Sequence, residues 1–219
     1  MSGENPVSYL SMAQFFEIHA QDPQPRLIRR SVDILLQGGV IVYPTDSSYA
    51  LGCRIGEKSA LERMRSIRNL DHAHNFTLVC RDLSEITTYA RIDNQAFRLL
   101  KSLTPGPYTF IHQATKQVPR RLLHPRRKTI GIRVPDNVIC RTLLAELGQP
   151  ILSTTLMLPS DDMPLTDPYE MRERLDREVE LVIDGGFCGL EPTTVLDMAQ
   201  EPPLVLRLGK GDTSRFDQG

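Results

Sequence analysis

Helical and strand periods alternate along this chain, and this alternation is the feature that most restricts its fold. The segment 26–37 has its apolar residues on one helical stripe and is followed by two glycines. Short apolar runs come next, bounded by Pro and Gly, and each is typical of a buried strand. The pattern predicts an α/β architecture. Strands at 108–134 and 180–207 come without helices between them, so we expect a mixed sheet.

The expected elements span most of the chain. We expect helices at 26–37, 58–69, 137–147 and 167–175, and two more after the N-caps Asp82 and Asp93. We expect strands at 40–44, 51–55, 76–80, 108–112, 130–134, 150–155, 179–185, 193–198 and 203–209. Residues 1–11 are small and polar, and we interpret them as a flexible leader or an alternative start before one domain at 12–219.

The composition excludes several classes of protein. The 219 residues include 26 Lys and Arg against 27 Asp and Glu, so no global field attracts nucleic acid or a membrane, and any basic site must be local. The cysteines form no CxxC pair, which favours buried thiols in a reducing cytoplasm. No apolar run approaches the roughly 20 residues that span a bilayer. We therefore expect a cytoplasmic protein with no membrane association.

The familiar catalytic and phosphate-binding motifs are absent, and the candidates are strand ends that present hydroxyls or charge. There is no GxxxxGK[ST], GxGxxG or nucleophile elbow, and the LGKGD segment at 208–212 is a weak phosphate loop. Thr45 and Asp46 directly follow an apolar strand, where they could face a cleft or form an ST or Asx turn. Ser153 and Thr155 lie at the end of another strand.

Charged residues supply further candidates. Arg133 lies in an apolar strand and must be paired or bind an anion. The alternative to an anion-binding role is a structural pair with Asp136, although Asp136 could instead cap the next helix. Arg68 ends a predicted helix, where a cation complements the macrodipole.

The densest positive run, at 120–128, includes Arg126, Arg127 and Lys128. These side chains could contact phosphate groups of a nucleotide or of RNA, or could lie on a solvated loop. His72 and His74 beside Asp71 are a weak metal motif because no second acidic motif accompanies them, and we expect no metal site.

The order and spacing of these motifs resemble the YrdC/YciO superfamily from Met12 onward, most closely its YciO branch. The resemblance rests on GGVIVYPTDSSYALGC, RSIRNLDHAHNFTLVC, TPGPYTF, TIGIRVPDN, PILSTT, PTTVLD and VLRLGKGD, with MAQFF and NFTLVCRDLSE pointing to the branch. It implies a single YrdC-type domain with a twisted mixed sheet, flanking helices and a basic concave cleft. It also implies binding of nucleotide, and of tRNA or double-stranded RNA.

The synthases of this superfamily make L-threonylcarbamoyladenylate from ATP, L-threonine and bicarbonate, in the pathway to the t6A modification of tRNA. The resemblance implies that the threonine amine captures bicarbonate and that the resulting carbamate attacks the α-phosphate of ATP and displaces pyrophosphate. This nucleotidyl transfer needs positive charge on the phosphates, with Mg²⁺ as an expected companion of ATP. It needs no protein nucleophile, and the sequence shows none.

The resemblance assigns roles to individual residues. Thr45, Arg133 and Thr194 correspond to substrate contacts, the arginine facing the amino-acid carboxylate. The residues that correspond to nucleotide contacts are Arg68, Thr129, Ser153, Thr155 and Arg207.

The chain departs from the synthases at two motifs. Where they have KxRP, this chain has Arg68, Asn69, Leu70 and Asp71, so one arginine becomes Leu70; His74 and Asn75 fill a region that usually holds another basic residue. Where they have STSAN, Met157 replaces the asparagine and cannot donate its hydrogen bonds. Two hypotheses follow: a synthase of weak or altered activity, and a nucleotide- or RNA-binding paralogue that has lost the chemistry.

Overall fold

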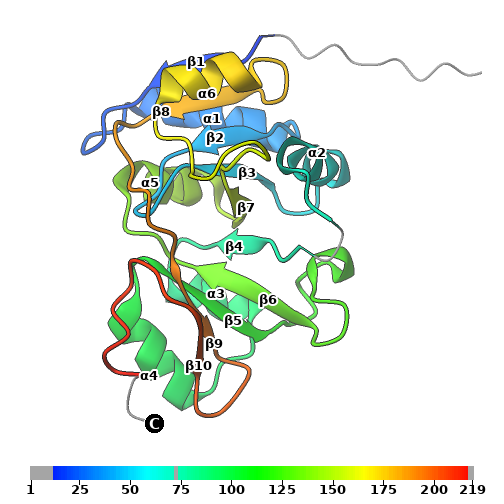
Figure 1. Ribbon diagram of the computed structural model, residues 1–219, viewed down its shortest axis with the longest axis vertical. Coiled ribbons are helices and arrows are strands. Elements are labelled where there is room, and N and C mark those ends of the chain that lie inside the picture. Colours follow the sequence, from blue (N-terminus) through cyan, green and yellow to red (C-terminus); the bar gives the residue numbers. More distant parts are fainter. Residues whose placement is uncertain (1–11, 72–73, 217–219) are drawn as a thin grey trace, which may run out of the picture.

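Ten strands form one sheet in the computed structural model, which describes residues 12–71 and 74–216 (Figure 1). The strands are β1 (Gln14–Glu17), β2 (Ile41–Tyr43), β3 (Ala50–Arg54), β4 (Thr77–Val79), β5 (Tyr108–Gln113), β6 (Thr129–Arg133), β7 (Ile151–Thr155), β8 (Leu181–Asp184), β9 (Thr194–Asp197) and β10 (Leu204–Arg207). The helices are α1 (Pro25–Leu36), α2 (Lys58–Arg68), α3 (Leu83–Tyr89), α4 (Asn94–Leu103), α5 (Val138–Leu147) and α6 (Pro168–Leu175), with a 3-10 helix η1 (Arg120–Leu122).

The strand order is β1-β8-β2-β3-β7-β4-β6-β5-β9-β10. Parallel pairs join β1 to β8, β2 to β8, β4 to β6 and β5 to β9, and the other neighbours are antiparallel. The predicted α/β class and mixed sheet are confirmed. β1 was not predicted as a strand, because only one of its four residues is buried and no alternation marks it.

Local capping signals explain where several helices begin and end. Asp82 accepts a hydrogen bond from the backbone N–H of Glu85, and Asp93 accepts from the next turn of α4, so both predicted N-caps are confirmed. α2 ends at Arg68, and its C-cap Asn69 adopts a left-handed conformation with φ 50°.

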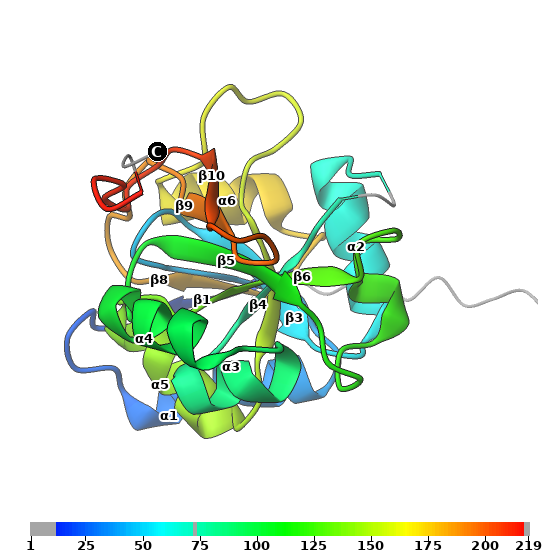
Figure 2. The same ribbon diagram turned by 90° about the horizontal axis from the view of Figure 1, so that it is seen from below.

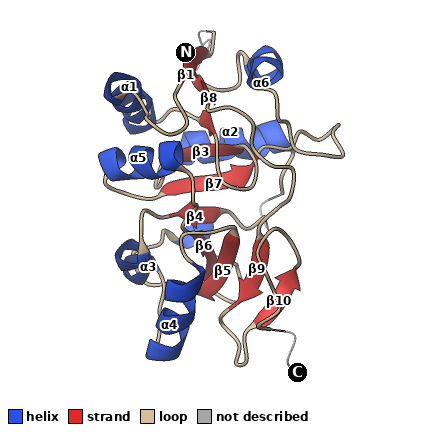
Figure 3. Ribbon diagram, turned by 90° about the vertical axis from the view of Figure 1, so that its left-hand side faces the viewer, coloured by secondary structure: helices blue, strands red, loops and turns tan. Residues whose placement is uncertain are grey.

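Each face of the sheet has its own helices and its own apolar core. On one face, Ile28 and Val32 of α1 and Leu143 of α5 pack on β2, β3 and β8. The larger core lies on the other face and includes residues from α2, α3, α4 and α6. Figure 3 shows α1 and α5 on one side of the sheet and α6 on the other. In the part of the chain that the structure describes, the core under α1 and α5 extends as far as Val79 of β4 and includes no residue of β5, β6 or β9.

Several expectations concern the whole chain. All four cysteines are free and buried, as predicted (Cys53, Cys80, Cys140 and Cys188). Within 12–71 and 74–216, no helix combines the length and apolarity needed to cross a bilayer. The expected leader at 1–11 lies outside the described residues.

His112 in β5 predicts how the stability of the fold depends on pH. Its side chain is buried with Nε2 unpartnered, and burial lowers its pKa to about 4. The unfolded chain, with a His pKa near 6.5, binds this proton more readily, so stability is lost as pH falls from about 6.5 towards 4. Between pH 7 and 5 we expect His112 to account for a loss of about 2 kcal/mol in the free energy of unfolding.

Urea denaturation of the wild type and of His112→Leu at both pH values measures this loss. Between pH 7 and 5, the free energy of unfolding of the leucine variant should fall by about 2 kcal/mol less than that of the wild type. The substitution removes the titrating group and leaves the surrounding carboxylates unchanged. Equal losses in the two proteins would contradict the prediction.

Candidate functional site

A cleft of about 720 Å³ lies on the part of the sheet that α1 and α5 leave uncovered. Side chains alternate between the faces of a strand, and paired residues share a face, so every second residue of five neighbouring strands points into the cleft. These residues are Thr77 and Val79, Thr109 and Ile111, Thr129, Gly131 and Arg133, Ser153 and Thr155, and Thr193 and Val195. The cleft has the size of a small-molecule site and a floor rich in hydroxyls.

Two loops and the edge strand border the floor. The connection between β7 and α6 projects from the sheet in Figure 2 and contributes Met157 and Asp162 to the lining. β10 and the segment before β9 contribute Leu190, Leu206 and Arg207. The lining contains four arginines (Arg68, Arg127, Arg133 and Arg207) and one carboxylate, Asp162.

The structure brings eight of the eleven predicted site residues to this cleft. Those that line it are Thr45, Arg68, Arg127, Thr129, Arg133, Ser153, Thr155 and Arg207. Those that do not are Thr194, Arg126 and Lys128.

Thr194 points away from the cleft. Its hydroxyl donates to the carbonyl of Gly211 at 2.7 Å and accepts from the N–H of Gly209 at 3.1 Å, and the residue is fully buried. The neighbouring Thr193 faces the cleft instead, with its Oγ1 2.8 Å from that of Thr109. Strand alternation therefore places Thr193, and not the predicted Thr194, in the lining of the cleft.

The basic segment at 120–128 forms an ordered turn beside the cleft. The N–H groups of Arg126 and Arg127 donate to Nδ1 of His124 at 3.3 and 3.1 Å. Arg126, Arg127 and Lys128 are all exposed residues, and the Arg127 guanidinium also reaches the lining and pairs with the buried Asp197 at 2.5 Å. Part of the segment is therefore structural, and its outer part is available to solvent.

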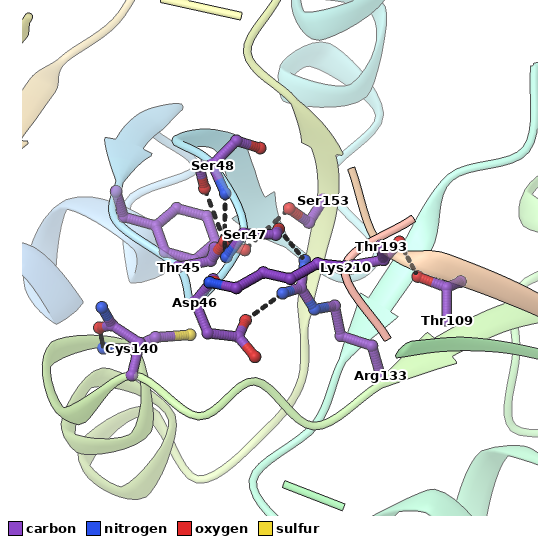
Figure 4. Close-up of polar contacts among 12 residues, drawn as sticks. Thr45, Asp46, Ser47, Ser48, Thr109, Arg133, Cys140, Ser153, Thr193 and Lys210 are labelled. Atoms are coloured by element: carbon purple, nitrogen blue, oxygen red, sulfur yellow. Dashed lines mark hydrogen bonds and ion pairs between the residues drawn. The ribbon is translucent and has the colours of Figure 1, made fainter. Parts of the chain in front are cut away.

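Arg133 is paired with Asp46 at the C-terminal end of β6 (Figure 4). Its Nη2 donates to Asp46 Oδ1 and its Nη1 donates to Ser47 Oγ at 3.2 Å. Both side chains are about nine-tenths buried, and Arg133 Nε and Asp46 Oδ2 have no partner. Asp136, the partner weighed from the sequence, instead lies 3.8 Å from Arg141 at the surface, and Asn137 caps α5.

The loop after β2 is held by its own hydroxyls. Thr45 Oγ1 donates to the carbonyl of Ser48 at 2.6 Å and accepts from the N–H groups of Ser47 and Ser48, both at 3.2 Å. This is the ST turn that the sequence offered as an alternative. Figure 4 shows Lys210 crossing the loop, where its Nζ donates to the carbonyl of Asp46 at 2.6 Å. The LGKGD segment thus anchors this loop.

Ser153 and Thr155 are delivered by β7, as predicted. Ser153 Oγ accepts from the Tyr43 hydroxyl at 2.7 Å and donates to the carbonyl of Leu51 at 3.0 Å. Burial raises the pKa of Tyr43, which keeps that hydroxyl protonated and able to donate. The serine therefore has a fixed orientation, and Thr155, two residues further along β7, is less buried and also lines the cleft.

Arg68 and Arg207 differ from the other two cleft arginines in having no carboxylate partner within the described ranges. Arg68 donates to the carbonyls of Met157 at 2.7 Å and Thr155 at 2.6 Å. Arg207 donates to the carbonyl of Thr193 at 2.9 Å and to its hydroxyl at 3.0 Å. Burial lowers the pKa of both groups, with the charge of Arg133 adding to the effect at Arg207. Two positive charges thus remain uncompensated, which favours binding of an anion.

The two departures from the synthase motifs occupy different places. Leu70 packs against the larger apolar core and does not line the cleft. Met157 does line it, and its carbonyl binds Arg68. Leu70 therefore replaces a charge with core packing, while Met157 changes the cleft surface itself.

The metal motif considered from the sequence gains no support here. His72 lies outside the described residues, and His74 lines the cleft 3.3 Å from the Thr154 hydroxyl. No group of three or more His, Cys, Asp or Glu residues suited to a metal ion occurs in the part of the chain that the structure describes.

Sequence reasoning missed several cleft residues on or beside the strands of the floor, among them Thr109, Thr193 and Gly131. Thr109 and Thr193 form a hydroxyl pair beside Arg207, and Gly131 leaves the middle of the floor without a side chain. A Cβ at Gly131 would lie 3.1 Å from Thr77 Oγ1. The sequence signal for these residues was the alternation of side chains along each strand. This alternation identifies the residues that face the cleft only when the order of the strands is known.

These features define a mixed-sheet α/β protein with an arginine-lined cleft, and the comparisons identify its family. The Sua5/YciO/YrdC family model, described as "Telomere recombination", matches residues 33–209. The chain therefore belongs to the Sua5/YciO/YrdC family.

Known relatives agree with this assignment. An uncharacterized protein of Haemophilus influenzae is 58% identical over 206 residues, covering 94% of this chain and all of the relative. The crystal structure of Escherichia coli YciO matches with a TM-score of 0.90 and 56% identity, over 94% of this chain and all of YciO. Pyrococcus abyssi Sua5, solved as a complex with L-threonine, shares the fold with a TM-score of 0.81 at 23% identity, over 89% of this chain and 57% of Sua5.

The Arg133–Asp46 pair predicts a large difference between two aspartate substitutions. Asp46→Asn should destabilise the fold by about 3 kcal/mol, because removal of one partner leaves a buried charge unpaired. Asp136→Asn, which removes a partner from an exposed pair, should change stability by at most about 0.5 kcal/mol. Urea denaturation at pH 7 measures both, and similar effects for the two variants would contradict the assigned pairing.

Proposed function

We propose that the cleft binds ATP and that the protein is an L-threonylcarbamoyladenylate synthase of weak or altered activity, located in the cytoplasm. The observation that carries this proposal is the pair of uncompensated guanidiniums, Arg68 and Arg207, beside a floor of hydroxyls. The polyphosphate of ATP would supply the negatively charged partner that these guanidinium groups lack. The fold shared with a Sua5 solved with L-threonine supports the second substrate.

Each group in the cleft has a role in the proposed reaction. Arg68 and Arg207 would hold phosphate oxygens and stabilise the charge that develops as pyrophosphate leaves. Thr109 and Thr193 share one hydrogen bond, so one of their hydroxyl protons remains available to a ligand beside Arg207. Mg²⁺ would enter with ATP, coordinated mainly by phosphate and water oxygens, since Asp162 is the one carboxylate of the described lining.

The Arg133–Asp46 pair supports the weak or altered activity. In the proposed site the carboxylate of L-threonine approaches Arg133, whose Nη1 and Nη2 already donate to Ser47 and Asp46. The substrate must therefore use the unpartnered Nε or displace one of these contacts. Met157 adds to the effect, because its thioether cannot donate a hydrogen bond to a ligand.

The alternative function is that of a non-catalytic paralogue that binds tRNA or double-stranded RNA. It is favoured by the exposed Arg126 and Lys128, which stand beside the cleft without lining it. Such residues suit phosphate groups of a larger ligand, because backbone recognition is electrostatic and needs no enclosed pocket.

Calorimetric titration with ATP tests the nucleotide site. Arg207→Ala should weaken ATP binding by roughly 10- to 100-fold, because a hydrogen bond to a charged group is worth about 1.5–3 kcal/mol. Arg126→Ala is the matched control, since it removes an exposed arginine outside the lining and should leave the affinity unchanged. Equal affinities for all three proteins would reject the assignment of Arg207.

Pyrophosphate release in the presence of ATP, L-threonine and bicarbonate tests the synthase activity. We expect slow release that requires threonine and is lost in Arg133→Ala. The double variant Arg133→Ala/Asp46→Asn removes the orphaned carboxylate, and its thermal unfolding shows whether the loss reflects the site or the fold. Absence of release by the wild type, with ATP binding retained, would reject the synthase and favour the paralogue.

Binding to a short RNA duplex across a range of salt concentrations tests the alternative function. The double variant Arg126→Ala/Lys128→Ala should bind more weakly and lower the slope of log affinity against log salt by on the order of one per lost phosphate contact. Arg26→Ala/Arg29→Ala, which removes two exposed arginines of α1, is the control. Binding that does not depend on salt would exclude the proposed phosphate contacts.

A further inference from the structure

His74 lies in the cleft beside Arg68, and the two side chains meet at one hydroxyl. Thr154 Oγ1 accepts a hydrogen bond from Arg68 Nη1 at 3.0 Å and lies 3.3 Å from His74 Nε2. The imidazole is partly buried and stands edge-on to Phe76, with ring centroids 5.2 Å apart and an interplanar angle of 86°. These contacts hold the ring at the edge of the proposed anion site.

The surroundings keep this imidazole neutral when the cleft is empty. Burial lowers the pKa of His74, the charges of Arg68 and Arg65 lower it further, and Asp71 acts in the opposite direction. The Thr154 hydroxyl can serve either form of the ring, because it accepts from Arg68 and can still donate to a neutral Nε2 or accept from a protonated one. Protonation therefore keeps the contact with Thr154 and requires only that its hydroxyl proton turn away from the ring.

An anion beside Arg68 reverses the electrostatic balance. Its negative charge offsets the repulsion from the two arginines and favours the imidazolium. We propose that His74 is a ligand-binding residue that completes the anion site with Arg68 by taking up a proton from solvent when a polyphosphate binds. This inference rests on the proposed binding of an anion in the cleft. Protonated His74 joins Arg68 and Arg207 as a third cation, which is present only in the bound state.

Proton uptake makes the affinity for the anion dependent on pH. Affinity should rise as pH falls from 8 towards 6, by up to tenfold per pH unit where one proton is taken up. The phosphates of ATP titrate in the same range, so the informative quantity is the difference between the wild type and a variant that cannot be protonated. His74→Asn is that variant, because its amide can still hydrogen bond to Thr154 and carries no charge.

Two measurements on the full chain test the proposal. NMR titration of the imidazole, assigned by its loss in His74→Asn, should show the midpoint of His74 rising by about 1 pH unit or more when ATP saturates the protein. Calorimetry in buffers of different ionisation enthalpy should show proton uptake in the wild type relative to His74→Asn. His74→Lys, a permanent cation, should bind ATP more tightly than the wild type at pH 8.

The outcomes separate this proposal from the proposed function. ATP binding with an unmoved His74 midpoint would overturn the role of His74 and leave the nucleotide site intact. Proton uptake that persists in His74→Asn and disappears in His124→Asn would also overturn it, since His124 is another histidine in the lining. If ATP fails to bind but tripolyphosphate binds and raises the midpoint, the role of His74 stands and the nucleotide site does not.

Discussion

The buried ion pair between Arg133 and Asp46 joins two parts of the sheet on which the cleft depends. Asp46 follows β2 and Arg133 ends β6, and three strands separate β2 from β6 in the sheet. The pair therefore reaches across the cleft side of the sheet, where Ser47 adds a second contact and Lys210 fixes the loop from the C-terminal segment. It also neutralises Arg133, so Arg68 and Arg207 are the arginines of the described lining that have no carboxylate partner.

The chemistry of the cleft follows from its place on the sheet. β4, β6, β5 and β9 turn one face to the cleft, and the alternate residues on that face are Thr and Gly as well as Val, Ile and Arg133. The neighbouring β7 adds Ser153 and Thr155. Hydroxyls on rigid strands hold fixed positions because the ladder constrains the backbone and paired hydroxyls constrain each other. For the proposed ligand, such a floor would provide orientation and the arginines at its edges would provide electrostatic attraction.

Patterns that are local in sequence predicted much of the fold. The caps Asp82 and Asp93 lie within three residues of the groups they bind, so the sequence window contains both partners. Arg133 was recognised as a buried charge that needs a partner, yet its partner lies 87 residues away, and no local pattern distinguishes Asp46 from the nearer Asp136. Thr193 and Thr194 show the same limit, because strand pairing alone decides which of them faces the cleft.

The sequence by itself determined the α/β class, most helices and strands, and the family to which the motifs belong, because periodicity, capping and motif spacing are properties of neighbouring residues. The tertiary structure decided which strands lie side by side, which arginines keep an uncompensated charge, and that His74 meets Arg68 at Thr154. These outcomes depend on contacts between residues distant in sequence. Their energies arise from burial and charge pairing, which exist only once the sheet has assembled.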